Sequence, residues 1–285
     1  MAQHIGFVTD STADLPAEIA REYDIHVVPL NIHFGDETLI DGLEISIEQF
    51  YERFRTSPVL PNTSQPSPGR FVEEFHKLSG EYDQIFSIHI SQKMSGTYQS
   101  ALMAAEMVKD EVPITVIDSQ QVSIALAMML MELSTMAKAG AGSKELLKSI
   151  ASFPERSGTF FTVSTLEYLE RTGRIGKATA FLGQILNIRP LLSLSEGLII
   201  PVERVRGGIE RVLMRMLDIV EGKVGNKICS IGIVHAMLDQ QKDFLQGKLA
   251  ESGMQIEKMV VAPVGPVVGS HAGPTVIGLH YLMEG

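Results

Sequence analysis

Three short apolar segments, each followed by a polar loop and then by a helical pattern, constrain the fold of this chain most strongly. They are IGFVTD (5–10), QIFSIHI (84–90) and PITVID (113–118), and all three are predicted to be strands. Strands that alternate with helices indicate a mostly parallel sheet covered by helices on both faces. Ligands of such sheets bind beyond the carboxyl ends of the strands, and hydroxyl-bearing residues follow all three strands here. We therefore predict an α/β fold with an anion site at that edge of the sheet.

The pattern changes in the second half of the chain. The segment RPLLSLSEGLIIPVERVR (189–206) is typical of a hairpin that turns at Glu196-Gly197, and alternating helices and strands follow it. We therefore predict two domains: an N-terminal α/β/α domain over residues 1–153, with a mostly parallel sheet, and a smaller C-terminal α+β domain over residues 154–285.

Several local patterns give further predictions. Residues 25–34, IHVVPLNIHF, are predicted as one extended run that Pro29 makes an edge or irregular strand. A helix that begins at Ser143 is predicted to end near Ser152, and His271 is predicted to lie in a loop. A group of methionines is expected to pack in the core rather than to line a ligand tunnel: Met103, Met107, Met128, Met129 and Met131.

Composition and charge exclude several classes of protein. The formal net charge of −10 over 285 residues argues against a broad nucleic-acid surface, because phosphate contacts need clustered Lys and Arg. Cys229 is the only cysteine, which excludes internal disulfides and Cys-rich metal sites and fits a reducing compartment. The longest clean apolar run, residues 124–131, is too short to cross a bilayer, and the first residues do not resemble a signal peptide. We expect a cytoplasmic protein that does not insert into membranes.

The residues Ser95-Gly96-Thr97 fall where the helix after the second strand is predicted to begin. A helix N-terminus gathers free N–H groups and the positive end of the helix dipole, so it favours an anion. Gly96 lets backbone or ligand come close, and the two hydroxyls add uncharged donors. The simpler interpretation is that Ser95 or Thr97 caps the helix.

Common catalytic and cofactor motifs do not occur in the sequence. Gly176-Lys177 is followed by Ala178, and Arg171 stands where a P-loop needs its first glycine. The chain also has no GxGxxG, no HExxH pair, no zinc-type spacing of Cys and His, and no GxSxG around Ser95. We therefore expect neither a metal nor a cofactor.

Several blocks of sequence, taken together, resemble the DegV family of bacterial lipid-binding proteins. They occur in the family's order and cover nearly the whole chain, and the most informative are VTDSTADLP (8–16), TSQPSPG (63–69), MSGTYQSA (94–101), VIDSQQVS (116–123), LEYLERTGRIG (166–176), LGQILNIRPLL (182–192) and GPVVGSHAGP (265–274). The resemblance implies an α/β N-terminal domain, a smaller α+β domain and a fatty acid between them. It also implies that the Gly- and Pro-rich tail, residues 263–285, returns to the ligand site.

The resemblance also implies roles for single residues. Thr63, Ser95 and His271 would bind the carboxylate of a long-chain fatty acid. Backbone and hydroxyl groups next to them would support this trio, namely Ser64, Gly96 and Thr97. Such proteins present the bound acid to a fatty acid kinase, which converts it to an acyl-phosphate, and do not catalyse this reaction alone.

The basic cluster Arg171, Arg174 and Lys177 has two interpretations. It is either a solvated surface or, through Arg174, a docking site for the kinase.

Other functions stay open at this point. Ser95 and His271 would suit a Ser-based hydrolase, although the sequence names neither an orienting acid nor an oxyanion hole. Phosphorylation of His271 would make the chain a phosphotransfer protein, and a lipid-responsive regulator would need no kinase. Thr63 could also simply begin a turn, and His271 could be a packed structural histidine.

Overall fold

The computed structural model describes residues 4–182 and 188–284. Part of the LGQILNIRPLL block, residues 183–187, lies outside the described residues. The elements up to residue 156 are β1 (Ile5–Asp10), η1 (Ser11–Ala13), α1 (Ala17–Glu22), β2 (Ile25–Val28), β3 (Asn31–Phe34), β4 (Glu37–Ile40), α2 (Ile47–Thr56), β5 (Asn62–Ser64), α3 (Pro68–Leu78), β6 (Gln84–His89), α4 (Thr97–Met107), β7 (Ile114–Asp118), α5 (Ile124–Lys138) and α6 (Ser143–Arg156). The later elements are β8 (Ser157–Thr162), α7 (Glu167–Arg171), η2 (Gly176–Phe181), β9 (Ile188–Ser195), β10 (Leu198–Arg206), α8 (Ile209–Val224), β11 (Ile228–His235), α9 (Asp239–Glu251), β12 (Gln255–Pro263), α10 (Pro266–Ala272) and β13 (Ile277–Met283).

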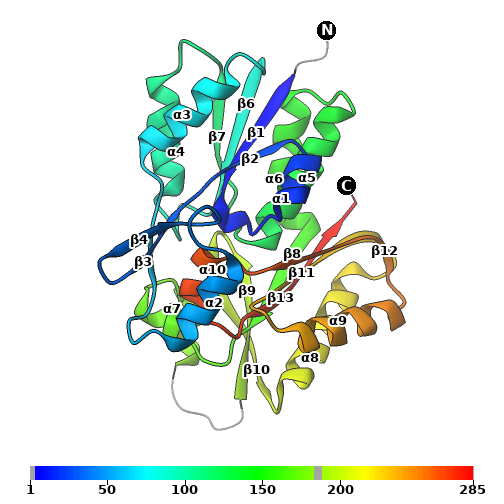
Figure 1. Cartoon of the computed structure of the whole chain (residues 1–285). Helices are drawn as coiled ribbons and strands as arrows, with labels where there is room; N and C mark the ends of the chain where they lie inside the picture. Colours follow the sequence, from blue (N-terminus) through cyan, green and yellow to red (C-terminus); the bar gives the residue numbers. More distant parts are fainter. Residues whose placement is uncertain (1–3, 183–187, 285) are drawn as a thin grey trace.

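A four-stranded parallel sheet of order β2-β1-β6-β7 organises the first part of the chain. The two central strands, β1 and β6, are almost fully buried because both faces of the sheet are covered, whereas the edge strands β2 and β7 are partly exposed. Helices α3 and α4 pack on one face through Phe71, Phe75 and Ala101, and α5 packs on the other face (Figure 1). The predicted α/β architecture with a mostly parallel sheet is therefore confirmed.

A six-stranded mixed sheet, of order β10-β9-β8-β13-β11-β12, occupies the second part. Within this sheet β11 and β12 are parallel, and every other neighbouring pair is antiparallel. The β9–β10 hairpin turns at Glu196 and Gly197, as predicted, and both residues have positive φ angles (50° and 74°). Helices α8 and α9 cover one face of the sheet. The division into two domains at residue 153 stays a prediction.

A small three-stranded sheet of order β4-β3-β5 was not predicted. The run 25–34, predicted as one extended segment, is in fact two strands in different sheets, with β2 in the parallel sheet and β3 in the small one. The break falls at Pro29, whose ring removes a ladder hydrogen bond. The small sheet matters for function because β5 carries Thr63, which pairs with Ile32 of β3.

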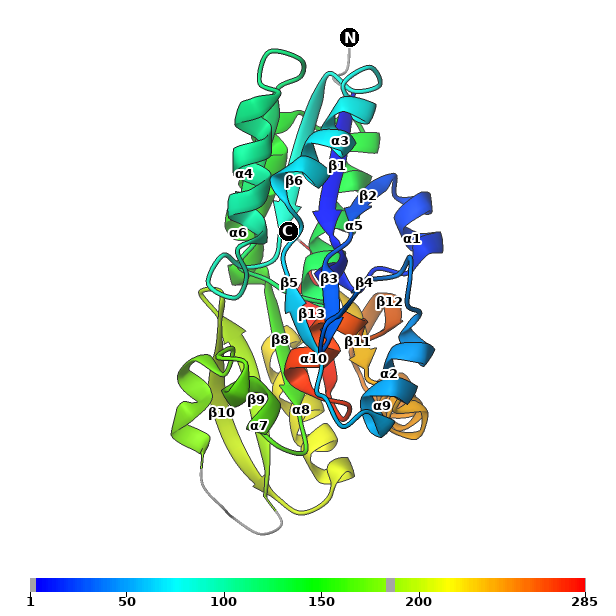
Figure 2. The ribbon, with the colours of Figure 1, turned by 60° about the vertical axis from the view of Figure 1, so that its left-hand side comes forward.

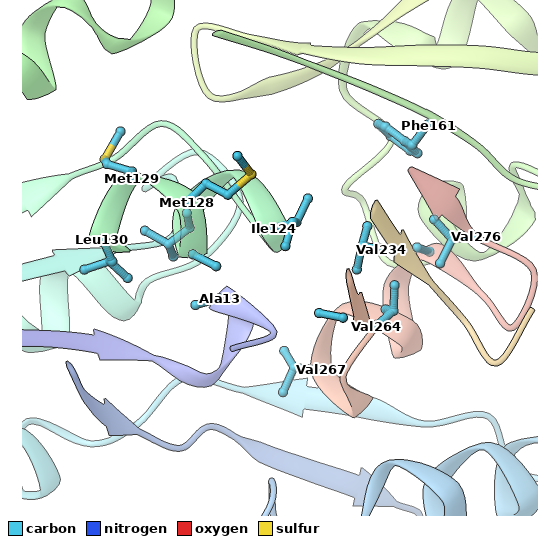
Figure 3. Packing of buried hydrophobic residues seen from close by; sticks show 14 of the residues in the cluster. Ala13, Ile124, Met128, Met129, Leu130, Phe161, Val234, Val264, Val267 and Val276 are labelled. Carbon is cyan, nitrogen blue, oxygen red and sulfur yellow. The ribbon is translucent and has the colours of Figure 1, made fainter. Parts of the chain in front are cut away.

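Helix α5 lies between the two larger sheets and belongs to a core shared by both (Figure 3). Ile124 and Met128 face the strands of the six-stranded sheet, and Gly232 of β11 permits this close approach: a Cβ there would lie 2.5 Å from Ile124 Cγ1. The methionine prediction is confirmed for Met128, Met129 and Met131, which are buried. It is wrong for Met103 and Met107, which are 52% and 68% exposed on α4.

The C-terminal tail is more regular than the sequence indicated. His271 lies in the short helix α10, not in a loop, and β13 forms the centre of the six-stranded sheet. Figure 2 shows α10 beside β5, so the tail returns to the first part of the chain. The helix predicted to end near Ser152 continues to Arg156 and contains Pro154. Among the helices of residues 4–182 and 188–284, none is both long and apolar enough to span a lipid bilayer.

Candidate ligand-binding site

A cavity of about 340 Å³ lies between the sheets, where β5, the loop before α4, α5, α10 and the six-stranded sheet meet. Its walls are mostly apolar and include Ile124 of α5, Phe161 and Val234 of the sheet, and Val267 and Val268 of α10. Small-molecule sites in proteins have volumes of about 300–1,000 Å³ and combine apolar walls with a few polar groups. The cavity therefore fits a ligand with a large apolar part.

Most polar residues of the cavity lining lie close to one another at one end, which we call the mouth: Thr63, Ser64, Gln65, Ser95, Gly96, Arg174 and His271. Thr63 Oγ1 and His271 Nε2 lie 2.7 Å apart, although 208 positions separate the two residues. Ser95 lines the same cavity, and its Oγ lies 2.8 Å from Thr97 Oγ1. The fold thus brings Thr63, Ser95 and His271 to one cavity from β5, the start of α4 and α10.

Close packing against the first part of the chain fixes the position of α10. A Cβ on Gly269 would lie 2.6 Å from Tyr51 Oη of α2, so only glycine allows this contact. The N–H of Gly265 donates to Asp14 Oδ1 at 2.8 Å, and the Ser123 hydroxyl donates to the other oxygen of the same carboxyl group. Burial raises the pKa of Asp14 to about 8. Asp14 therefore joins the end of β1, α5 and α10 behind the mouth.

The start of α4 packs closely against the residue that follows β5. A Cβ on Gly96 would lie 2.1 Å from Gln65 Oε1, and Gln65 Nε2 donates to Ser100 Oγ at 3.1 Å. The sequence predicted that Gly96 permits a close approach, and the group that approaches is the Gln65 side chain. This contact holds the Thr63 and Ser95 segments next to each other.

His271 is neutral at physiological pH. Burial of the imidazole, together with the positive charges of Arg174 and Arg171, lowers its pKa to about 4. Its Nδ1 is buried without a hydrogen-bond partner among the described residues. An anionic ligand beside this ring would therefore not compete with a carboxylate of the protein for Nδ1.

The whole length of the sequence matches one family. A model described as an uncharacterised protein family, DegV, matches residues 4–284. The chain belongs to the DegV family. The DegV protein of Bacillus subtilis is 30% identical over 278 residues, which are 97% of this chain and 98% of that protein. A DegV domain-containing protein of Streptomyces coelicolor is 33% identical over 281 residues, 98% of each chain.

Solved DegV family structures have the same fold. The structure of a DegV family protein from Thermus thermophilus, described by its fatty acid binding, has a TM-score of 0.93 at 32% identity and covers 99% of this chain and 100% of its own. DegV from Bacillus subtilis, described as a fatty acid binding protein, has a TM-score of 0.88 at 27% identity, with coverage of 99% and 100%. A Thermotoga maritima protein with a fatty acid binding function has a TM-score of 0.88 at 28% identity and the same coverage.

The predicted supporting residues of this DegV family member differ in position. Ser64 Oγ lies 2.9 Å from His33 Nε2, so His33, which had no predicted role, orients a residue of the mouth. Thr97 is fully buried behind Ser95 and bonds to it. Arg174 lines the mouth, is exposed, and its Nε donates to the Met94 carbonyl at 3.1 Å.

Four polar residues that line the cavity were not predicted as site residues from the sequence. Thr12, Gln65 and Ser123 lie within the VTDSTADLP, TSQPSPG and VIDSQQVS blocks, which were the available signal. Thr159 lies in a strand that gave none. Within residues 4–182 and 188–284, no group of three or more His, Cys, Asp or Glu side chains is arranged to hold a metal ion.

Proposed function

We propose that this protein binds a long-chain fatty acid in the cavity and holds its carboxylate at Thr63, Ser95 and His271. The observation that carries the proposal is the 2.7 Å contact between Thr63 and His271 at the polar mouth of a mostly apolar cavity that Ser95 also lines. Solved relatives at 27–32% identity over nearly their whole length are described as binding fatty acids. Head-group recognition at the mouth and tail burial in the cavity would then act together.

The tail supplies most of the affinity in this proposal. Burial contributes about 0.8 kcal/mol per CH₂ group, so a tail of about fourteen methylenes gains roughly 11 kcal/mol before the costs of ordering it. Each hydrogen bond to the charged head group adds about 1.5–3 kcal/mol. The mouth therefore sets the orientation of the ligand, while the cavity sets its affinity.

Hydroxyl and imidazole groups suit a carboxylate that must react afterwards. The Thr63 and Ser95 hydroxyls can rotate to donate to an incoming anion, and His271 can take up a proton as the anion approaches. A bidentate Arg clamp would instead cover both carboxylate oxygens. Arg174 lies at the mouth with its guanidinium already bonded to the Met94 and Thr172 carbonyls.

We further propose that the bound acid is presented to a fatty acid kinase, which converts it to an acyl-phosphate. Two exposed cations of this acidic protein, Arg171 and Arg174, lie close to His271 at the mouth, and the exposed Lys177 follows them in the chain. Such a patch can dock an acidic partner surface beside the carboxylate. In this proposal the chain itself supplies no chemistry beyond positioning the acid.

A Ser-based hydrolase fits the geometry less well. That mechanism needs a hydrogen bond from the serine to the histidine and an acid that orients the ring. His271 Nε2 bonds to Thr63 instead, and Nδ1 has no acidic partner among the described residues. The hydrogen bonds of the mouth therefore favour binding over acyl transfer.

Lipid binding is tested with protein stripped of lipid and reloaded with palmitate. Ser95→Ala and His271→Ala should each weaken binding by about tenfold to a hundredfold, since each loses a bond to the charged head group. Isothermal titration gives the affinity, and native mass spectrometry gives the stoichiometry. His4→Ala, which removes an exposed imidazole, is the matched control. Wild-type affinity in both mouth variants would overturn the site assignment.

The kinase step needs a separate measurement. A fatty acid kinase, ATP and hydroxylamine are added to the loaded protein, and the hydroxamate formed from an acyl-phosphate is measured. Arg174→Ala should lower the rate of hydroxamate formation while palmitate affinity stays unchanged. A rate equal to wild type would remove Arg174 from kinase docking, and no hydroxamate with any loaded protein would contradict the presentation role.

A further inference from the structure

The wall of the cavity formed by β8, β13 and β11 contains two successive rows of facing residues. In the first row Gly278 pairs with Phe161 and with Val234, and all three line the cavity. In the next row, two residues further along each strand, His280 pairs with Thr159 and with Gly232. Residues two apart in a strand lie on the same face, so this row faces the same side of the sheet as the first, and Thr159 also lines the cavity.

This second row lies at the end of the cavity away from the mouth. β8 ends at Thr162 and leads to α7 and Arg174, so going from Phe161 back to Thr159 leads away from the mouth. β13 begins after α10, so going from Gly278 to His280 also leads away from His271. We call this region, with Thr159 and His280, the deep end.

The deep end contains a buried polar pair. Thr159 Oγ1 lies 2.8 Å from His280 Nδ1, and the two residues are 7% and 0% exposed. His280 Nε2 has no hydrogen-bond partner among the described residues, and its ring stacks on Phe153 at 5.8 Å with an interplanar angle of 13°. Thr159 also lines the cavity, so a ligand tail that reached this end would lie against the Thr159 side chain.

The position of the proton on the neutral His280 ring decides whether the Thr159 hydroxyl donates a hydrogen bond to the ring or accepts one from it. A proton on Nε2 would bury an N–H without an acceptor, which is rare and costly. We therefore assign the proton to Nδ1, which then donates to Thr159 Oγ1. The hydroxyl hydrogen of Thr159 has no second partner among the described residues, so it is free to donate into the cavity.

The other hydroxyls of the cavity wall away from the mouth are already engaged. Thr12 Oγ1 donates to Asp10 Oδ1 at 2.5 Å, and the Ser123 hydroxyl donates to Asp14. Within the described part of the chain, Thr159 is the lining hydroxyl beyond the mouth that does not donate to a carboxyl group. A plain hydrocarbon tail would leave this donor unpaired.

We propose that the deep end recognises an oxygen atom on the acyl chain, so that the cavity takes an oxygenated long-chain fatty acid. A keto group, or a hydroxyl group acting as acceptor, would receive the hydrogen bond from Thr159. This inference rests on the proposed fatty acid binding and names the class of fatty acid. An oxygen elsewhere along the apolar cavity would lose its water without a partner, which weakens binding.

The test compares stearic acid with positional series of ketostearic and hydroxystearic acids on lipid-free protein. Most isomers should bind more weakly than stearic acid by about tenfold or more. The isomer whose oxygen reaches Thr159 should recover about fivefold relative to its neighbours in the series. Thr159→Val, which keeps the shape and removes the hydroxyl, should abolish this recovery, so that the favoured isomer binds no better than its neighbours in the series, and Thr159→Ser should keep it.

Thr162→Val is the matched control, since it removes a buried hydroxyl from the same strand on the opposite face. It should leave the favoured position unchanged. Stearic acid binding with no favoured position, or a favoured position that persists in Thr159→Val, would overturn this inference and leave the proposed function intact. If neither stearic acid nor any oxygenated isomer binds, the proposed function itself fails.

Discussion

Two histidines, the partly buried His271 at the mouth and the fully buried His280 at the deep end, make the same kind of contact in different settings. Each ring bonds through one nitrogen to a threonine hydroxyl, His271 to Thr63 at 2.7 Å and His280 to Thr159 at 2.8 Å. The second nitrogen of each ring has no partner among the described residues. Burial lowers the pKa of both, to about 4 for His271 and about 3 for His280.

The difference lies in what surrounds each pair. His271 and Thr63 come from separate segments and meet at a mouth beside Arg174, where an anion can reach them. His280 and Thr159 are paired across neighbouring strands of one sheet, and burial alone lowers the pKa of His280. The His–Thr pair at the mouth can therefore respond to a ligand, whereas the sheet fixes the His–Thr pair at the deep end.

The largest predicted effect is the loss of folding stability in acid that His280 causes. The pKa of His280 is about 3 in the folded chain and near 6.5 when unfolded, so below pH 6.5 the unfolded state binds a proton that the folded state refuses. Stability therefore falls as the pH falls from 6.5 toward 3. Between pH 7 and pH 4 this group alone should cost about 3 kcal/mol.

His280→Phe should remove this contribution while the stack on Phe153 is retained. We expect the free energy of unfolding, from urea titrations at pH 7 and pH 4, to fall by about 3 kcal/mol less in the variant than in wild type. His4→Phe, at an exposed position, is the control for loss of an imidazole. Equal losses in wild type and His280→Phe would mean that the buried ring is protonated in the folded state.

Binding of a fatty acid should change the pKa of His271 but not the pKa of His280. A carboxylate within about 4–6 Å of an imidazole raises its pKa by about 1–3 units, because it stabilises the charged ring. Palmitate should therefore raise the pKa of His271 from about 4 by at least about one unit, and His280 should not move. Nitrogen-labelled histidine NMR measures both. A shift at His280, or none at His271, would reverse the roles given to the two ends.

The sequence predicted the elements better than the contacts between them. The parallel sheet, the β9–β10 hairpin and the start of α4 have strong local patterns of apolar residues and turn residues. β5 has none, because its three residues, Asn62, Thr63 and Ser64, are all polar and β3 alone makes them a strand. α10 has seven residues and two glycines, so its Gly-rich sequence indicated a loop.

The two ends of the cavity differ in how much of them could be predicted. The mouth residues Thr63, Ser95 and His271 lie in blocks that resemble a known family, so their sequence positions could be named before their contacts were known. The Thr159–His280 pair depends on the register of β8 against β13, and the two residues are 121 positions apart. Sequence patterns fix which residues form strands but not which residues face each other across them.

Gly278 lies between the two ends of the cavity, and its substitution by alanine should have the smallest effect of the changes considered. A Cβ added there would lie 3.2 Å from Phe161 Cβ and 3.2 Å from Val234 Cγ1, and its methyl group would enter the cavity. Gly278→Ala should displace about one methylene of a long tail and weaken stearate binding about fourfold. Octanoate, whose short tail stays near the mouth, should bind as in wild type.

Gly222→Ala is the matched control, because a Cβ there meets nothing within 4 Å. Isothermal titration of both acids with both variants completes the comparison. If Gly278→Ala weakens octanoate as much as stearate, the substitution has disturbed the mouth rather than the passage. The ordering of the two acids thus decides whether the tail runs along the β8–β13–β11 wall toward Thr159, which recognition of a chain oxygen at the deep end requires.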